Sequence, residues 1–219
     1  MDAKKIIDEA TAVIFDLDGV LVDTAVFHYQ AWKRLAHQFD FDFTEVENEQ
    51  LKGVSRTDSL NLILKWANKD IPAQEKEQLA SSKNTWYLEL VEEMKDGDVL
   101  PGTIELLNYL KETGKKIALG SASKNAVRIL EKTGIRHYFD AIVDGNAVRR
   151  SKPDPEVFLK AAAFVGVEPV ACVVLEDAQA GIEAAKAANM RVVAVDKSRT
   201  LTDYDSRVED LGEILISEY

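Results

Sequence analysis

Five short, mostly apolar runs constrain the fold of this chain more than any other feature. Runs of this length and composition are typical of strands that are buried on both faces of a parallel sheet. Helical patterns fill most of the segments between them. This alternation indicates an α/β fold with an open parallel sheet and helices on both of its faces. The runs are residues 12–15, 116–119, 141–143, 172–175 and 192–195.

The spacing of these runs divides the chain unevenly. The first run ends at residue 15 and the second starts at residue 116, which is far more chain than one crossover helix needs. Apolar residues in this gap recur at helical spacing, as in Leu60, Ile63 and Leu64. We therefore predict a helical domain inserted after the first strand. The inserted domain would span residues 23–95, with helices near 26–39, 57–67 and 74–94, and the α/β core would span 1–22 and 96–219.

Pro, Gly and Ser residues mark the expected ends of the core helices. Ser123 is a candidate cap for a helix that runs to Thr133, and Pro155 suits the first position of a helix that Gly166 ends. Residues 1–10 precede the first run, and we expect them to form a helical extension.

The charge balance excludes several classes of function. The 219 residues include 38 acidic and 27 basic side chains, for a net charge of −11. A nucleic-acid-binding protein or a polybasic membrane anchor would carry the opposite balance. The sequence shows no transmembrane-length apolar run, and residues 1–10 lack the apolar region that is typical of a signal peptide. It has a single cysteine, Cys172, which we expect to be buried. We expect a monomeric cytoplasmic protein.

Polar side chains follow the ends of the predicted strands. They are Asp16 and Asp18, Ser121, Lys152, and Glu176 with Asp177. Because the carboxyl ends of parallel strands lie at one edge of a sheet, we expect these groups to converge there. Four neighbouring carboxylates repel one another, and a hard divalent cation with oxygen ligands relieves that repulsion. Mg²⁺ is the cation we expect.

The same groups suit phosphoryl transfer. Ser121 and nearby backbone N–H groups can hold phosphate oxygens, and Lys152 can neutralise their charge. Asp16, directly after the strand, is placed to attack phosphorus and form an aspartyl-phosphate, while Asp18 can exchange a proton with the substrate oxygen. Any one of these acids could instead cap a helix or bind Mg²⁺ without catalysis, but that explanation does not account for the whole set.

The order of these motifs resembles a known family. Residues 16–24, with the sequence DLDGVLVDT, resemble the first motif of the haloacid dehalogenase superfamily of phosphotransferases. Ser121, Lys152 and the Glu176–Asp177 pair match its second, third and fourth motifs in order. The resemblance implies a Rossmann-like core with the first strand in the centre, and a helical cap that closes over the site. Ala178 departs from the pattern, because many relatives have Ser there.

The resemblance also implies a ligand set for the metal. Mg²⁺ would be bound by the Asp16 carboxylate, the Asp18 carbonyl group and Asp177, with Glu176 close by.

Four further segments resemble the sugar-phosphate mutases of this superfamily. They are residues 27–32, 51–60, 82–84 and 121–125. The resemblance implies that a phosphoryl group moves between β-glucose 1-phosphate and glucose 6-phosphate, through β-glucose 1,6-bisphosphate. Such a mutase needs a second site for the phosphate that is not being transferred. Arg56 is suited to clamp that phosphate, and Ser123, Lys124 and Asn125 to complete the clamp.

The resemblance extends the candidate substrate-binding set into the cap. The full set is His28, Trp32, Leu51, Lys52, Gly53, Val54, Ser55, Arg56, Lys83, Ala122, Ser123, Lys124 and Asn125. Several members have simpler explanations when taken alone. His28 could be a packing residue, Lys83 a solvated charge, and Trp32 part of the apolar core.

Two other functions remain open at this stage. The first is a sugar phosphatase or pyrophosphatase on the same scaffold, which Arg56 and residues 123–125 argue against because hydrolysis needs no second phosphate site. The second is a non-catalytic protein that binds phosphosugars, which the intact Asp16 and Asp18 pair argues against.

Overall fold

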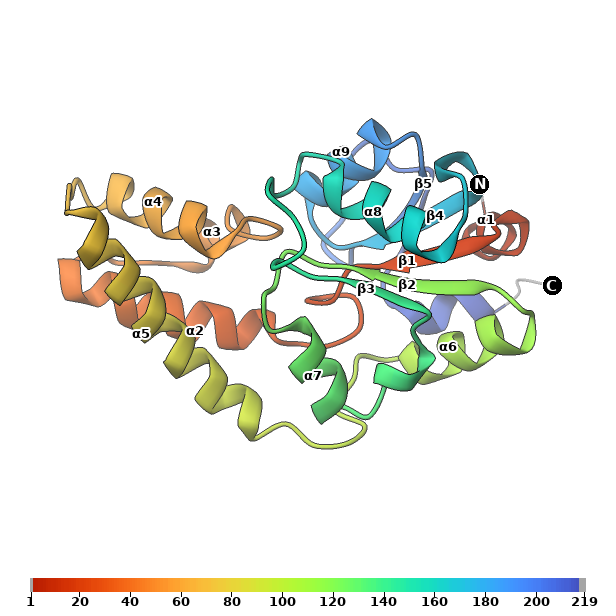
Figure 1. Cartoon of the computed structure of the whole chain (residues 1–219), viewed down its shortest axis with the longest axis horizontal. Helices are drawn as coiled ribbons and strands as arrows, with labels where there is room; N and C mark the ends of the chain where they lie inside the picture. Colours follow the sequence, from red (N-terminus) through yellow and green to blue (C-terminus); the bar gives the residue numbers. More distant parts are fainter. Residues whose placement is uncertain (1, 217–219) are drawn as a thin grey trace.

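A six-stranded parallel sheet forms the centre of the molecule (Figure 1). The computed structural model describes residues 2–216. The strand order is β3-β2-β1-β4-β5-β6, so the first strand is central and the expected α/β class is confirmed. The strands are β1 (Ala12–Phe15), β2 (Lys116–Gly120), β3 (Ala141–Val143), β4 (Cys172–Glu176), β5 (Arg191–Val195) and β6 (Ser206–Val208).

The sixth strand was not predicted from the sequence. Only Val208 of its three residues is buried, so the segment lacks the apolar run that marks the other strands. It pairs with β5 at the edge of the sheet, where one buried side chain is sufficient.

Alternate residues of β1 pack into different apolar layers, as the two-residue repeat of a strand requires. Val13 and Phe15 face one layer, and Ile14 faces the other. The first layer includes residues of α1 (Ala3–Glu9), α6 (Thr103–Glu112) and α7 (Ala126–Lys132), and the second includes residues of α8 (Glu156–Val165) and α9 (Gln179–Ala187). The helical extension expected at the N-terminus is therefore α1, and its apolar residues belong to the first apolar layer.

The α-helices between β1 and α6 lie beside the sheet rather than on its faces (Figure 1). They are α2 (Ala25–Ala36), α3 (Glu45–Glu49), α4 (Arg56–Trp66) and α5 (Ala73–Glu92). They have an apolar cluster of their own that includes Trp32, Leu35, Leu60 and Ile63. We call these helices the cap, and the domain limits at 23 and 95 remain a prediction.

Helix α3 was missed because none of its residues is buried, so it has no apolar periodicity. A capping box between Thr44 and Glu47 is its only local signal. The remaining helical turns are the 3₁₀ segments η1 (His37–Phe39), η2 (Arg136–Tyr138), η3 (Pro169–Ala171) and η4 (Leu211–Leu215).

Two predicted helix starts were wrong. Helix α7 starts at Ala126 rather than after Ser123, because the Ser121 and Ser123 hydroxyl oxygens each accept the N–H two residues ahead and keep the chain in tight turns. Pro155 precedes α8 instead of occupying its first position.

Cys172 is fully buried in β4, as expected. Within residues 2–216, no helix combines the length and the apolar character that crossing a bilayer requires.

Candidate functional site

The register of the sheet brings the predicted site residues together. Phe15 of β1 lies opposite Leu119 of β2 and Leu175 of β4. The residues that follow these three in their strands therefore lie at the same edge of the sheet. Asp16 is level with Glu176 of β4 and with Gly120 of β2, and Ser121 is the next residue after Gly120. The parallel pairing alone explains why motifs so distant in sequence converge.

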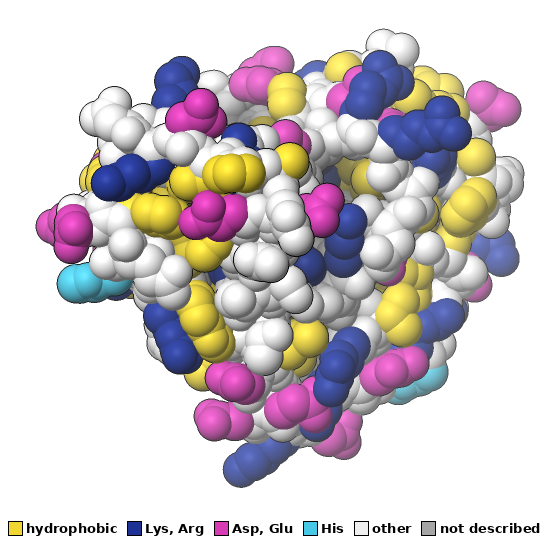
Figure 2. Space-filling model, turned by 60° about the vertical axis from the view of Figure 1, so that its left-hand side comes forward, with side chains coloured by type: hydrophobic (Ala, Val, Ile, Leu, Met, Phe, Trp, Pro, Cys, Tyr) yellow, Lys and Arg dark blue, Asp and Glu magenta, His cyan; other side chains and the backbone are white. Residues whose placement is uncertain are grey.

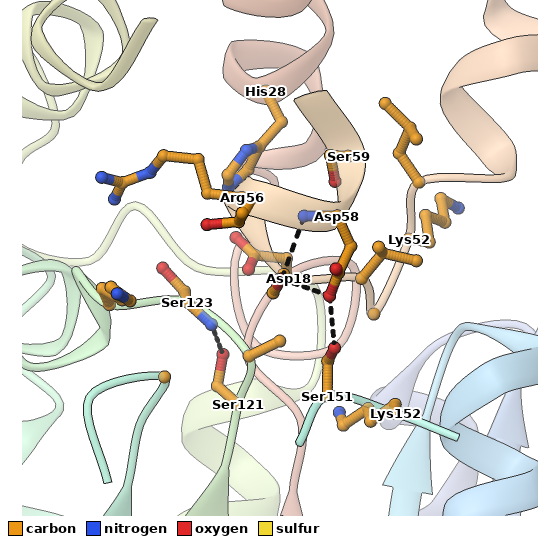
Figure 3. A pocket seen from close by; sticks show the side chains of 18 of the residues that line it. Asp18, His28, Lys52, Arg56, Asp58, Ser59, Ser121, Ser123, Ser151 and Lys152 are labelled. Carbon is orange, nitrogen blue, oxygen red and sulfur yellow. Dashed lines mark hydrogen bonds between the residues drawn. The ribbon is translucent and has the colours of Figure 1, made fainter. Parts of the chain in front are cut away.

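A cavity of about 350 Å³ lies where this edge of the sheet meets the cap. Every residue that the sequence predicted for the site lines this cavity except Glu176, which is fully buried behind it. Figure 3 shows Arg56 and His28 on the cap side, with Ser121, Ser123 and Lys152 on the core side. The volume suits a small ligand.

The lining is rich in cations although the protein is acidic. Lys and Arg side chains outnumber Asp side chains among the lining residues. Figure 2 shows dark blue Lys and Arg side chains in a recess near the middle of this face. The cavity thus offers an anionic ligand a local attraction that the net charge of −11 would not provide.

Lys152 joins two of the acids. Its Nζ atom donates to Asp16 Oδ1 at 2.6 Å and to Glu176 Oε1 at 3.0 Å, and its side chain is almost completely buried. Burial alone would lower the pKa of Lys152, but the two carboxylates outweigh it and hold the pKa above its usual value. Lys152 is therefore a fixed cation beside the Asp16 carboxylate.

The acids of this edge fit a divalent cation. One oxygen from each of Asp16, Glu176 and Asp177 lies within 4.8 Å of the others. Burial and the neighbouring carboxylates raise the pKa values of Glu176 and Asp177. A crowded set of oxygen donors with unfavourable negative charge is what Mg²⁺ neutralises. Asp16 and Asp177 line the cavity and could bind the ion directly, while the oxygens of Glu176 already accept from Lys152 and from the Asp177 N–H.

Gly19 makes room for this arrangement. Its φ is +80°, a conformation that side chains other than glycine rarely adopt, and a Cβ atom there would collide with the Asp177 carboxylate. The glycine of the first motif thus allows the first and fourth motifs to meet.

Asp18 has the electrostatics of a proton-transfer group. The Thr24 hydroxyl donates to Asp18 Oδ1. Burial, together with the Asp16 and Asp177 carboxylates, raises the pKa of Asp18 to about 7, although the bond from Thr24 acts in the opposite direction. The Asp18 carboxyl group can therefore either give or take a proton near neutral pH.

Two predicted cap residues form a buried pair. Lys83 Nζ donates to His28 Nδ1 at 2.8 Å, and the Trp32 and Tyr87 rings face the ammonium group at 4.5 and 4.8 Å. Burial, with the nearby cations Lys83 and Arg56, lowers the pKa of His28 well below its usual value. Lys83 is not a solvated charge, because it is only 2% exposed.

Replacing Lys83 with Met should stabilise the protein at low pH. Burial and Arg56 lower the pKa of Lys83 to about 7 in the folded state, against 10.5 for an ordinary lysine. The cost of the buried charge is complete below pH 7 and disappears as pH rises to about 10, because the unfolded chain then also loses its proton. We expect Lys83→Met to raise Tm by at least about 3 °C at pH 6 and by less at each higher pH.

The measurement is thermal unfolding of both proteins across this pH range. The exposed Lys65 of α4, replaced by Met, is the matched control and should show no such trend. A gain that is the same at every pH would attribute the effect to packing instead of charge.

The loop after β2 presents a row of donors. Ser123 N–H donates to Ser121 Oγ at 3.0 Å, and Asn125 N–H donates to Ser123 Oγ at 3.2 Å. Since the serine oxygens accept these bonds, their hydroxyl protons remain free to donate elsewhere. Asn125 Nδ2 also donates to Asn84 Oδ1 in the cap, at 2.9 Å.

Several residues of the site were missed from the sequence. Asp58, Ser151, Arg149 and Arg150 also line the cavity, and Thr24 bonds to Asp18. Arg150 and Ser151 are the two residues before the predicted Lys152, and this proximity in the sequence could have identified them. Asp58 and Thr24 lie in segments that the resemblance singled out, but their bonds to Ser151 and Asp18 depend on how the chain folds.

A family model described as "Haloacid dehalogenase-like hydrolase" matches residues 13–195. The chain belongs to the haloacid dehalogenase-like hydrolases. Among proteins of this kind, it is 42% identical over 207 residues to a β-phosphoglucomutase of Bacillus subtilis, covering 94% of this chain and 92% of the relative. It is also 34% identical over 187 residues to a fructose-1-phosphate phosphatase of Escherichia coli, covering 84% of this chain and 95% of that relative.

A solved haloacid dehalogenase-like structure agrees with the fold. The crystal structure of β-phosphoglucomutase from Clostridium difficile superposes with a TM-score of 0.90 at 42% identity, covering 93% of this chain and 92% of that one. The chain is therefore an enzyme of the phosphotransferase and phosphatase type found among haloacid dehalogenase-like hydrolases.

Proposed function

We propose that this enzyme is a Mg²⁺-dependent β-phosphoglucomutase that converts β-glucose 1-phosphate into glucose 6-phosphate through β-glucose 1,6-bisphosphate. The observation that carries this proposal is that one cavity is lined by two separate sets of side chains, each of which includes cationic and hydroxyl groups that suit a phosphate group. Asp16, Ser121 and Lys152 form one set at the sheet edge. Arg56 and Lys124 belong to a second set, which hydrolysis would not require.

The reaction follows from the positions of the first set. In one half-reaction an Asp16 oxygen attacks the phosphorus atom at C1 of the bisphosphate, the bond from phosphorus to the C1 oxygen breaks, and the Asp18 carboxyl group gives that oxygen its proton, which releases glucose 6-phosphate. In the other half-reaction the 6-hydroxyl of β-glucose 1-phosphate attacks the aspartyl-phosphate, which forms the bisphosphate again, and Asp18 takes the hydroxyl proton. Mg²⁺, when bound by Asp16 and Asp177, would neutralise charge on the transferred group.

The second set would hold the other phosphate of the bisphosphate. Arg56 projects from the start of α4 above Ser121 and Ser123 in Figure 3. Its guanidinium group can form two parallel bonds to a phosphate, and Ser123, Lys124 and Asn125 would complete the clamp from the core. The cap above Asp16 would also keep water from the aspartyl-phosphate.

The Arg56→Ala variant should lose mutase activity selectively. Charge-assisted hydrogen bonds to the distal phosphate are worth about 10- to 100-fold in kcat/KM. A small aryl phosphate has no distal phosphate, so its slow hydrolysis should be largely retained. Parallel assays of glucose 6-phosphate formation and aryl phosphate hydrolysis test this.

Arg56→Lys is the matched control, because it keeps the charge and loses the paired geometry; its activity should be intermediate. Equal loss of both activities in Arg56→Ala would argue against a distal-phosphate site.

The alternative is a sugar-phosphate phosphatase, which the 34% identity to a fructose-1-phosphate phosphatase favours. Water would then replace the second sugar hydroxyl. The two functions differ in product, since a phosphatase releases free phosphate.

A further inference from the structure

Among the described residues, three pairs of polar side chains make contact across the cavity. Each joins a lining residue of the cap to a lining residue of the core. The pairs are Lys52 Nζ with Asp177 Oδ2 at 3.2 Å, Asp58 Oδ2 with Ser151 Oγ at 3.0 Å, and Asn84 Oδ1 with Asn125 Nδ2 at 2.9 Å. The structure therefore holds the cap against the core through its own side chains.

Two of these contacts use groups that the reaction would occupy. Asp177 is a candidate ligand of the divalent cation, and Asn125 belongs to the loop proposed to bind the distal phosphate. Ligand binding would compete with both contacts. The contact between Asp58 and Ser151 uses neither group, so it can persist when the site is filled.

The local geometry of Asp58 links two phosphate-binding cations. Its Oδ2 atom accepts the Ser55 hydroxyl at 2.6 Å. The same atom accepts the Ser151 hydroxyl at 3.0 Å (Figure 3). The Asp58 N–H in turn donates to Ser55 Oγ at 3.2 Å, which caps α4. Ser55 directly precedes Arg56, and Ser151 directly precedes Lys152. A single carboxylate oxygen thus fixes the chain beside both cations.

We propose that Asp58 is a positioning residue that latches the cap to the core and sets the separation between Arg56 and Lys152. This inference rests on the proposed transfer of a phosphoryl group from Asp16. The separation of the two cations must match the span of a sugar bisphosphate, so the latch favours substrates with two phosphates over small phosphate esters. Asp58 and Ser151 are exposed or half-buried, so water can replace their bond when the cap opens.

The test is a double-mutant cycle of Asp58→Ala and Ser151→Ala in the full-length protein. Each variant should lower kcat/KM for β-glucose 1-phosphate by about 3- to 10-fold, mainly through KM, and the double variant should be little worse than either one. A looser cap should also admit water, so free phosphate should rise relative to glucose 6-phosphate. Asp58→Asn keeps an oxygen acceptor and should recover most of the lost activity.

Ser198→Ala is the matched control, because it removes a serine-to-aspartate bond of 2.8 Å that lies outside the cavity lining. It should change neither the kinetics nor the product ratio. Additive effects of Asp58→Ala and Ser151→Ala, or an unchanged product ratio in both, would overturn the latch.

Small-angle X-ray scattering of the ligand-free proteins separates this inference from the proposed function. The latch predicts a larger radius of gyration for Asp58→Ala and Ser151→Ala than for the unmodified protein and for Ser198→Ala. If the unmodified enzyme released only free phosphate, the mutase proposal would fail while scattering still decided the latch. Identical scattering by all four proteins would contradict the latch whatever the product.

Discussion

Asp16→Asn should abolish turnover of every phosphate ester that the enzyme accepts, by at least about 10⁴-fold. The amide has the shape of the carboxylate, but its oxygen is a poor nucleophile and cannot form an aspartyl-phosphate. Lys152 retains Glu176 as a partner at 3.0 Å, so the fold should tolerate the change. Product formation and mass spectrometry of the protein after incubation with substrate are the measurements.

The exposed Asp42 provides a control for the removal of one negative charge, and Asp42→Asn should behave like the unmodified protein. Retention of activity within tenfold in Asp16→Asn, or a phosphorylated peptide that does not contain residue 16, would place the nucleophile elsewhere.

Lys152→Met should cause the largest loss of stability. Lys152 is a buried cation between Asp16 and Glu176, and its removal leaves two buried carboxylates that face each other. Breaking a buried ion pair in this way costs about 3–5 kcal/mol. We expect Tm to fall by about 10 °C and phosphoryl transfer to be lost with it.

Magnesium should reverse part of this loss, because a divalent cation can neutralise the same oxygens. Thermal unfolding with and without Mg²⁺ should therefore show a larger Mg²⁺-induced rise in Tm for Lys152→Met than for the unmodified protein. The control is Lys65→Met, which removes an exposed lysine of α4 and should change Tm little. If Mg²⁺ raised both Tm values equally, these acids would not be its site.

The core strands were predictable because a strand that is buried on both faces must consist of apolar residues. The apolar run at 12–15 matches β1 residue for residue, and the run at 141–143 matches β3. Strand β6 has one buried residue and helix α3 has none, so neither carries an apolar pattern. Prediction therefore failed where an element is held by its ends or by a neighbour rather than by an apolar face.

The convergence of the site residues was predictable from the parallel arrangement of the strands. Parallel strands place their following residues at one edge, and the acids, Ser121 and Lys152 all follow strands or their loops. The individual bonds were not predictable. The sequence assigns Lys152 to phosphate oxygens, yet its ammonium group also binds Asp16 and Glu176, because a buried cation needs charged or polar partners.

The cap contacts depend even more on tertiary structure. Lys83 and His28 are 55 residues apart, and no periodicity connects them. Asp58 and Ser151 are 93 residues apart on opposite sides of the cavity. Such pairs are fixed by how the cap sits on the core, which the sequence pattern of either part does not specify.

The central claim is that the phosphoryl group returns to the sugar rather than to water. The direct measurement supplies β-glucose 1-phosphate, Mg²⁺ and a trace of glucose 1,6-bisphosphate, and follows glucose 6-phosphate and free phosphate in parallel. The account predicts glucose 6-phosphate with little free phosphate. Free phosphate without glucose 6-phosphate would contradict it and identify the enzyme as a sugar-phosphate phosphatase.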